Sequence, residues 1–137
     1  MTTPLENLSG PGKPLRAEPF DDREFQGLVA SGKARLADAL RAENSLSGRF
    51  DLAYNAAHAL SLAALRRLGF RPENRFIVFQ VLPHTLNLGP EVWRVLSKCR
   101  DLRNQAEYEG LLNVDERLVA DLVVACRALA EKLDGLP

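Results

Sequence analysis

One stretch near the C-terminal end carries most of the residues able to bind or transform a ligand: Arg100-Asp-Leu-Arg-Asn-Gln-Ala-Glu107, followed by Tyr108. If each residue turns by about 100° around a helix, Arg103 falls near the middle of an apolar stripe. A guanidinium keeps its charge and is costly to bury alone, so either the fold supplies a matching acid or this face lines a cleft. An arginine in a partly buried groove suits a phosphate or a partner's carboxylate.

The neighbours of Arg103 extend this candidate site. Arg103 and Glu107 lie one helical turn apart, and the simplest interpretation is an intrahelical ion pair worth roughly a few tenths of a kcal/mol if exposed. Arg100, Asn104 and Tyr108 lie successively further round the same side. We therefore predict a ligand site of these five residues, in which Arg103 holds a phosphate or an acid, Asn104 positions it, and Tyr108 stacks or donates a hydrogen bond.

Other catalytic patterns do not occur in the sequence, which has no glycine-rich phosphate loop, no nucleophile elbow and no pair of metal ligands at turn spacing. His58 lies beside an alanine-rich stripe and is expected to be structural or exposed, whereas His84 is expected to be solvated in a loop. Cys99 and Cys126 lie on apolar helical faces, which predicts buried free thiols. We expect neither a metal nor a cofactor.

The elements that position these residues are predicted to be helices, because alanine, leucine and arginine dominate and β-branched residues are few. Asp21 followed by Glu24 predicts a helix start with a capping box. Residues 76–79 fit a strand as well as a helix, but no second strand is available to pair with them. The predicted helices cover residues 21–43, 49–68, about 76–82 up to Pro83, 90–108 and 114–133.

The chain divides into a flexible arm over residues 1–20, rich in proline and glycine, and one helical domain over residues 21–137. We expect this domain to be an antiparallel up-and-down bundle of four long helices plus one short helix. With 18 basic and 18 acidic residues, no overall charge favours nucleic acid or a membrane. No signal-like or membrane-spanning stretch occurs, so we expect a cytoplasmic protein. Surplus apolar helix surface favours a homodimer.

The segment Arg103-Asn-Gln-Ala-Glu-Tyr108 resembles the signature of HEPN domains (higher eukaryotes and prokaryotes nucleotide-binding). Ala53-Tyr-Asn-Ala-Ala-His58 resembles the second helix of that family, Leu68-Gly-Phe-Arg-Pro72 the turn after it, and residues 74–79 the next short helix. The resemblance spans roughly residues 21–133 and is closest to small stand-alone HEPN proteins whose motif ends in Ala-Asp-Tyr or Ala-Glu-Tyr. It implies a HEPN-like bundle that dimerises and brings two motifs to one cleft.

Many HEPN proteins are metal-independent ribonucleases, including toxins paired with a minimal nucleotidyltransferase antitoxin, and their motif runs from Arg and a polar residue to His. By resemblance, Arg103 and Asn104 take the first two positions, but Glu107 and Tyr108 stand where the His is expected. The resemblance therefore implies a dimeric module, related to toxin–antitoxin systems, that binds a nucleotide, RNA or a partner protein. The proton carrier for RNA cleavage is missing.

Two alternatives remain open. The first is an active ribonuclease toxin with a nucleotidyltransferase partner, in which Arg103 and Tyr108 are the catalytic candidates, or His58 replaces the missing histidine. The second is a purely structural helical adaptor, in which the Arg103–Glu107 pair only fixes helix packing or a dimer interface.

Overall fold

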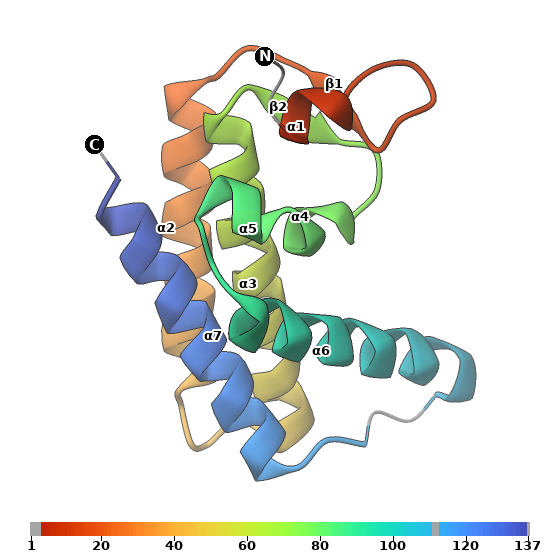
Figure 1. The fold of residues 1–137 in the computed structure, drawn as a ribbon. Helices are drawn as coiled ribbons and strands as arrows, with labels where there is room; N and C mark the ends of the chain where they lie inside the picture. The colour runs from red at the N-terminus through yellow and green to blue at the C-terminus, as the bar shows by residue number, and fades with distance from the viewer. Residues whose placement is uncertain (1–3, 111–112, 137) are drawn as a thin grey trace.

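The computed structural model describes residues 4–110 and 113–136. Of these residues, 69% are helical and 5% lie in strands, so the prediction of an all-helical protein is confirmed. The elements in chain order (Figure 1) are α1 (Pro4–Asn7), β1 (Leu15–Ala17), α2 (Asp22–Ala39), α3 (Leu46–Arg67), β2 (Phe70–Pro72), α4 (Ile77–Gln80), α5 (Leu82–Thr85), α6 (Pro90–Glu109) and α7 (Glu116–Asp134).

The helix ends follow local capping chemistry. The Asp21 carboxylate accepts a hydrogen bond from the N–H of Glu24 at 3.1 Å, which confirms the predicted start of α2. Ser45 caps α3 in the same way, so α3 begins three residues earlier than predicted. Gly110 ends α6 in the left-handed region with φ 72°, which an L side chain rarely adopts. The structure has two short helices, α4 and α5, where we predicted one that stops at Pro83. Pro83 lies in the first turn of α5, where its missing N–H costs nothing.

The core forms around α3, whose inward face consists of small residues and leucines. Ala53, Ala57 and Leu60 are fully buried. At Gly32 of α2, an added Cβ would lie 2.7 Å from Cγ of Leu60, so only glycine permits this approach between the two helices. Helices α2 and α3 consequently run side by side for most of their length (Figure 1).

The N-terminal residues differ from the flexible arm that we expected. Leu5 and Leu15 are 5% and 0% exposed and belong to the hydrophobic core. Strand β1 pairs antiparallel with β2, with Leu15 opposite Pro72 and Ala17 opposite Phe70. The sequence pattern missed this because prolines interrupt any periodicity here and the pairing partner lies more than 50 residues away.

A buried arginine fastens this N-terminal segment to the bundle. Arg66, near the end of α3, is 1% exposed. Its Nε donates to Oε1 of Glu24 at 2.5 Å and one terminal nitrogen donates to the carbonyl of Pro19 at 2.7 Å. The other terminal nitrogen donates to the carbonyls of Glu18 and Phe70 at 3.0 and 3.2 Å. Every nitrogen of this guanidinium therefore has an acceptor, as a buried charge requires.

Arg71 completes the cluster from the β2 side. It donates to Glu18 at 2.5 Å and to Glu24 at 2.6 Å, so two arginines and two glutamates alternate around one cluster. The hydrogen bonds from Arg71 and then Arg66 hold the pKa of Glu24 below its usual value of 4.5. We call Glu18, Glu24, Arg66 and Arg71 the four-residue ion cluster.

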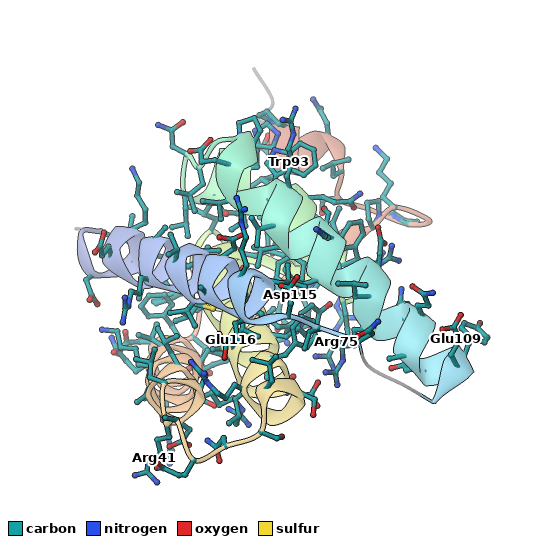
Figure 2. All side chains as sticks on the ribbon, turned by 90° about the horizontal axis from the view of Figure 1, so that it is seen from below. Arg41, Arg75, Trp93, Glu109, Asp115 and Glu116 are labelled. Atoms are coloured by element: carbon teal, nitrogen blue, oxygen red, sulfur yellow. The ribbon has the colours of Figure 1, made fainter. Side chains whose placement is uncertain are left out.

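The long helices do not form the regular up-and-down bundle that we expected. Figures 1 and 2 show α7 packing obliquely across α2 and α3, and α6 lying crosswise to them. The three buried residues of α6 are Val92, Leu96 and Cys99, all in its first half, so α6 touches the body over a short length. Its C-terminal end extends beyond the neighbouring helices (Figure 1).

Both cysteines are buried free thiols, as the sequence predicted. The Cys126 thiol donates to the carbonyl of Ala53 at 3.1 Å, linking α7 to α3. Burial raises the pKa of Cys99 and of Cys126 to about 12. Among the described residues, no helix is both long enough and apolar enough to cross a membrane.

Candidate functional site

A cavity of about 290 Å³ lies where the C-terminal half of α6 meets α3 and the segment before α4. Four of the five residues predicted as ligand-binding contribute to its wall, namely Arg100, Arg103, Asn104 and Glu107, all from α6. The eight lining residues are Tyr54, Asn74, Arg75, Phe76, Arg100, Arg103, Asn104 and Glu107.

The segment opposite α6 is held by a local cap. Oδ1 of Asn74 accepts a hydrogen bond from the N–H of Ile77 at 3.0 Å, which fixes the entry into α4. Arg75 and Phe76 lie between Asn74 and Ile77, so this hydrogen bond fixes the backbone that carries their side chains toward the cavity. Figure 2 shows Arg75 lying in the angle between α3 and α6.

Two arginines of α6 rest on aromatic rings. The Arg100 guanidinium lies 4.1 Å from the centroid of the Phe76 ring, and the Arg103 guanidinium lies 5.3 Å from that of Tyr54. Such cation–π contacts contribute about 0.5–1 kcal/mol when exposed and about 2 kcal/mol when desolvated. The rings thus fix the positions of the two cations before any ligand arrives.

Tyr54 forms part of the cavity wall and keeps its phenol protonated at neutral pH. Its side chain is largely buried, and this burial raises the pKa of its phenol. The charges of Arg103, Arg75 and Arg100 lower the same pKa, but burial is the larger effect. The phenol therefore stays neutral and serves as a platform for Arg103.

The acid that matches Arg103 comes from α3 and not from its own helix. One terminal nitrogen of Arg103 lies 2.6 Å from Oδ1 of Asp51, in an ion pair whose side chains are 33% and 51% exposed. The alternative interpretation, an intrahelical pair with Glu107, is not formed within residues 4–110 and 113–136. The sequence allowed either a matching acid or a cleft at Arg103, and both are found, because Arg103 pairs with Asp51 and also lines the cavity. Its remaining N–H groups stay available to a ligand.

The cavity carries an excess of positive charge. Three arginines line this cavity, whereas Glu107 is the only acidic residue among the described residues of its wall. Arg75 has no carboxylate within ion-pair distance in that part, and Arg100 has only its sequence neighbour Asp101 at 3.5 Å. An anion entering here meets several cations with unused hydrogen-bond donors.

A second cavity of about 280 Å³ lies on the other side of Arg103. Its walls are Asp51, Arg103, Ala106, Glu107 and Gly110, so it shares Arg103 and Glu107 with the first. The first cavity is basic and the second is acidic. We call them the basic cavity and the acidic cavity.

The two catalytic candidates outside this set lie away from the basic cavity. Tyr108 is 93% exposed and lines neither cavity. His58 does not line either cavity, and its Nε2 is buried without a hydrogen-bond partner among the described residues. Burial, assisted by the charge of Arg75, lowers the pKa of His58 to about 4, so this imidazole is neutral at physiological pH. His84 is exposed on α5.

Sequence reasoning missed the half of the site outside α6. Asp51 was not among the residues singled out, Tyr54 was assigned only to the segment that resembles the second HEPN helix, and residues 74–79 only to a short helix. One signal was present, since an aspartate and a tyrosine one turn apart interrupt an otherwise alanine-rich stripe. Within the described residues, no group of three or more His, Cys, Asp or Glu is placed to hold a metal ion.

No family model matches the chain, and neither the curated proteins nor the solved structures give a significant match. A function can therefore be inferred only from the residues and geometry of the two cavities.

Proposed function

We propose that the protein is a HEPN-like, non-catalytic module that binds a phosphate-bearing nucleotide or RNA in the basic cavity. The observation that carries this proposal is the convergence of Arg75, Arg100 and Arg103 on one cavity that a single glutamate lines. A structural role alone does not require three arginines to share one solvent-filled space, because like charges repel unless an anion lies between them.

The chemistry of the lining residues supports a phosphate. Guanidinium groups present planar arrays of N–H donors that match phosphate oxygens, often in bidentate pairs. The rings under Arg100 and Arg103 reduce the ordering that a ligand must impose on these long side chains. Asn104, exposed on the cavity wall, adds an amide that donates to phosphate or accepts from a base.

The positions of the proton carriers support binding without cleavage. Metal-independent RNA cleavage needs a general base and a general acid within hydrogen-bond reach of the reacting oxygens. Neither Tyr108 nor His58 lines the basic cavity. We therefore expect purified protein to leave RNA uncut even at high protein concentration, and turnover abolished by Arg103→Ala would contradict this part of the proposal.

Partners follow from the same proposal. The C-terminal end of α6 extends beyond the neighbouring helices (Figure 1), which suits pairing with a second copy and a shared cleft. A nucleotidyltransferase partner of the toxin–antitoxin type is the protein partner that the HEPN resemblance implies. Sedimentation showing a monomer at micromolar concentration would remove the shared cleft while leaving the basic cavity in place.

The binding proposal is tested by calorimetric titration of inorganic phosphate, adenosine monophosphate and a short RNA. Arg100→Ala and Arg103→Ala should each weaken binding about tenfold or more, because each removes a charged hydrogen-bond donor. Arg41→Ala is a matched control, since Arg41 is exposed just after the C-terminal end of α2, away from Arg75 (Figure 2). Equal losses in all three variants, or no binding by the wild type, would contradict the proposal.

One observation favours the structural-adaptor alternative, namely the Arg103–Asp51 pair between α6 and α3. If this pair only fixes helix packing, the double variant Arg103→Asp, Asp51→Arg should fold, assemble and bind every probe as the wild type does. If the basic cavity binds phosphate, the same variant should fold but lose phosphate binding, because the cation has moved out of the cavity.

A further inference from the structure

We infer that the basic and acidic cavities together bind two groups of one ribonucleotide, its 5′-phosphate at Arg75 and Arg100 and its ribose diol at Glu107. This inference rests on the proposed function and specifies the ligand class. It is built on the adjacency of two cavities of opposite charge that share Arg103 and Glu107 as a common wall.

Glu107 is the residue that a simple phosphate site leaves unexplained. Its carboxylate makes no hydrogen bond or ion pair within residues 4–110 and 113–136, although Arg103 lies one turn away on the same helix. A free carboxylate at the edge of an anion site repels phosphate. Its presence is accounted for if the ligand also brings hydrogen-bond donors, because an ionised carboxylate only accepts.

Asp51 is already engaged, which separates the roles of the two acids. Oδ1 of Asp51 lies 2.6 Å from Arg103, so Asp51 positions that arginine in the wall between the cavities. Glu107 is then the acid with both oxygens available, and it borders both cavities. A ligand that fills the basic cavity with an anion can therefore present donors to Glu107 without leaving the site.

A ribonucleotide has this distribution of groups. Its phosphate is anionic, and the 2′- and 3′-hydroxyls of the ribose lie a few bonds away as two adjacent donors. Acidic side chains accept hydrogen bonds from ribose hydroxyls in dinucleotide-binding folds, so the pairing is chemically ordinary. The 2′-hydroxyl is also the group by which a protein distinguishes RNA from DNA.

The same chemistry has two sources, a free mononucleotide or the terminal residue of an RNA strand with an unmodified 3′ end. Both carry a 5′-linked phosphate next to a free diol. The two cavities together, at about 290 and 280 Å³, offer room for a nucleotide-sized group.

The experiment compares adenosine monophosphate, its 2′,3′-dideoxy analogue and inorganic phosphate by calorimetric titration. The wild type should prefer adenosine monophosphate to the dideoxy analogue by about tenfold, the value of a hydrogen bond to a charged acceptor. Glu107→Gln should reduce this preference to about twofold or less, because a neutral amide is a weaker acceptor. The same variant should bind inorganic phosphate as well as the wild type or better.

Glu109→Gln is the matched control for charge and position. Glu109 lies on the same helix at its exposed tip, pairs with Gln105 at 3.2 Å and lines neither cavity (Figure 2). It should keep the full preference for the diol. If the wild type binds the dideoxy analogue equally well, or Glu107→Gln keeps the preference, the inference fails while phosphate binding stands. If none of the three probes binds, the proposed function fails as well.

A further arm identifies the source of the diol. An RNA trinucleotide with a free 3′ end that binds more tightly than adenosine monophosphate, and loses this advantage when it carries a 3′-phosphate, assigns the site to RNA ends. Tighter binding of the mononucleotide assigns it to free nucleotides. A trinucleotide that binds equally tightly with and without its diol overturns the inference.

Discussion

Two groups of arginines differ in their surroundings. Near the end of α3, two glutamates and three backbone carbonyls accept hydrogen bonds from Arg66 and Arg71. Nearer the start of α3, one cavity is lined by Arg75, Arg100 and Arg103 and by a single glutamate. In the four-residue ion cluster the positive and negative charges are equal in number and every nitrogen of Arg66 has an acceptor. In the basic cavity the arginines outnumber the acids, and aromatic rings take the place of carboxylates beneath two of them.

The difference separates arginines that stabilise the fold from arginines that remain available for binding. Arg66 is buried, so its partners must be internal and permanent. Arg103 is one-third exposed and uses one terminal nitrogen on Asp51, which leaves other donors for an incoming anion. Substitutions in the two clusters should therefore change different measurements.

The largest effect is expected for Arg66→Met, which fills a similar volume. It leaves the carbonyls of Pro19 and Phe70 without this donor, and it leaves Arg71 as the remaining partner of Glu24. Removing one partner of a buried ion pair costs about 3–5 kcal/mol. The free energy of unfolding, measured by urea denaturation, should fall by about this amount. A loss below about 1 kcal/mol would show that the cluster is not a fold determinant.

Acid should destabilise the protein through His58 of α3, whose Nε2 is buried without a hydrogen-bond partner among the described residues. The pKa of His58 is about 4 in the folded protein and 6.5 ordinarily, so the unfolded chain takes up a proton first as pH falls. Stability should decrease from about pH 6.5 down to about pH 4, by about 2–3 kcal/mol. Urea denaturation across this window measures it, and His58→Gln should flatten the profile.

Arg103→Ala should show the reverse pattern to Arg66→Met. Phosphate binding should weaken about tenfold, while the free energy of unfolding should change by less than about 1 kcal/mol because the Arg103–Asp51 pair is partly exposed to solvent. Calorimetry and urea denaturation on the same preparation provide both values. A large loss of stability with unchanged binding would assign Arg103 to the fold and would remove the contrast between the two clusters.

Glu24 provides a smaller test of the ion cluster at lower pH. Its pKa is lowered by hydrogen bonds from Arg71 and Arg66, so its contribution to stability is complete above its ordinary value of 4.5 and is lost as pH falls through the folded pKa. Glu24→Gln should remove this further decrease below pH 4.5 while leaving the His58 window intact. A profile that Glu24→Gln does not alter would contradict the proposed ionisation.

The smallest effect is expected from salt. Raising sodium chloride from about 50 to about 200 mM should weaken phosphate binding roughly two- to threefold, because exposed charges are screened over about a Debye length. The urea midpoint should change little, because Arg66 is buried and its partners are at hydrogen-bond distance. Equal salt sensitivity of both measurements would mean that the two clusters are not physically distinct.

Part of this arrangement was predictable from local sequence. The helical angle of Arg103 indicated that the fold must supply an acid or a cleft, and the helix types, the Asp21 cap and the buried thiols followed from periodicity and capping residues. These features depend on neighbours within a turn or two of helix. The all-helical class follows from the same local preferences.

The remaining features depend on how distant segments cross. Asp51 meets Arg103 only because α6 lies crosswise on α3, and no spacing rule specifies that angle. Tyr108 lies five residues after Arg103, which places it about 140° further round the helix, and it is exposed because the body of the protein ends before it. Leu5 and Leu15 are buried through the pairing of β1 with β2, which the proline-rich composition concealed.

The two buried thiols allow the rates at which α6 and α7 become exposed to be measured by chemical labelling. Cys99 and Cys126 are fully buried and have pKa values of about 12, so almost no thiolate exists at neutral pH in the folded protein. A thiol-specific reagent should therefore modify them only during excursions that expose α6 or α7. Because one cysteine lies on each helix, the two labelling rates distinguish release of α6 alone from global unfolding.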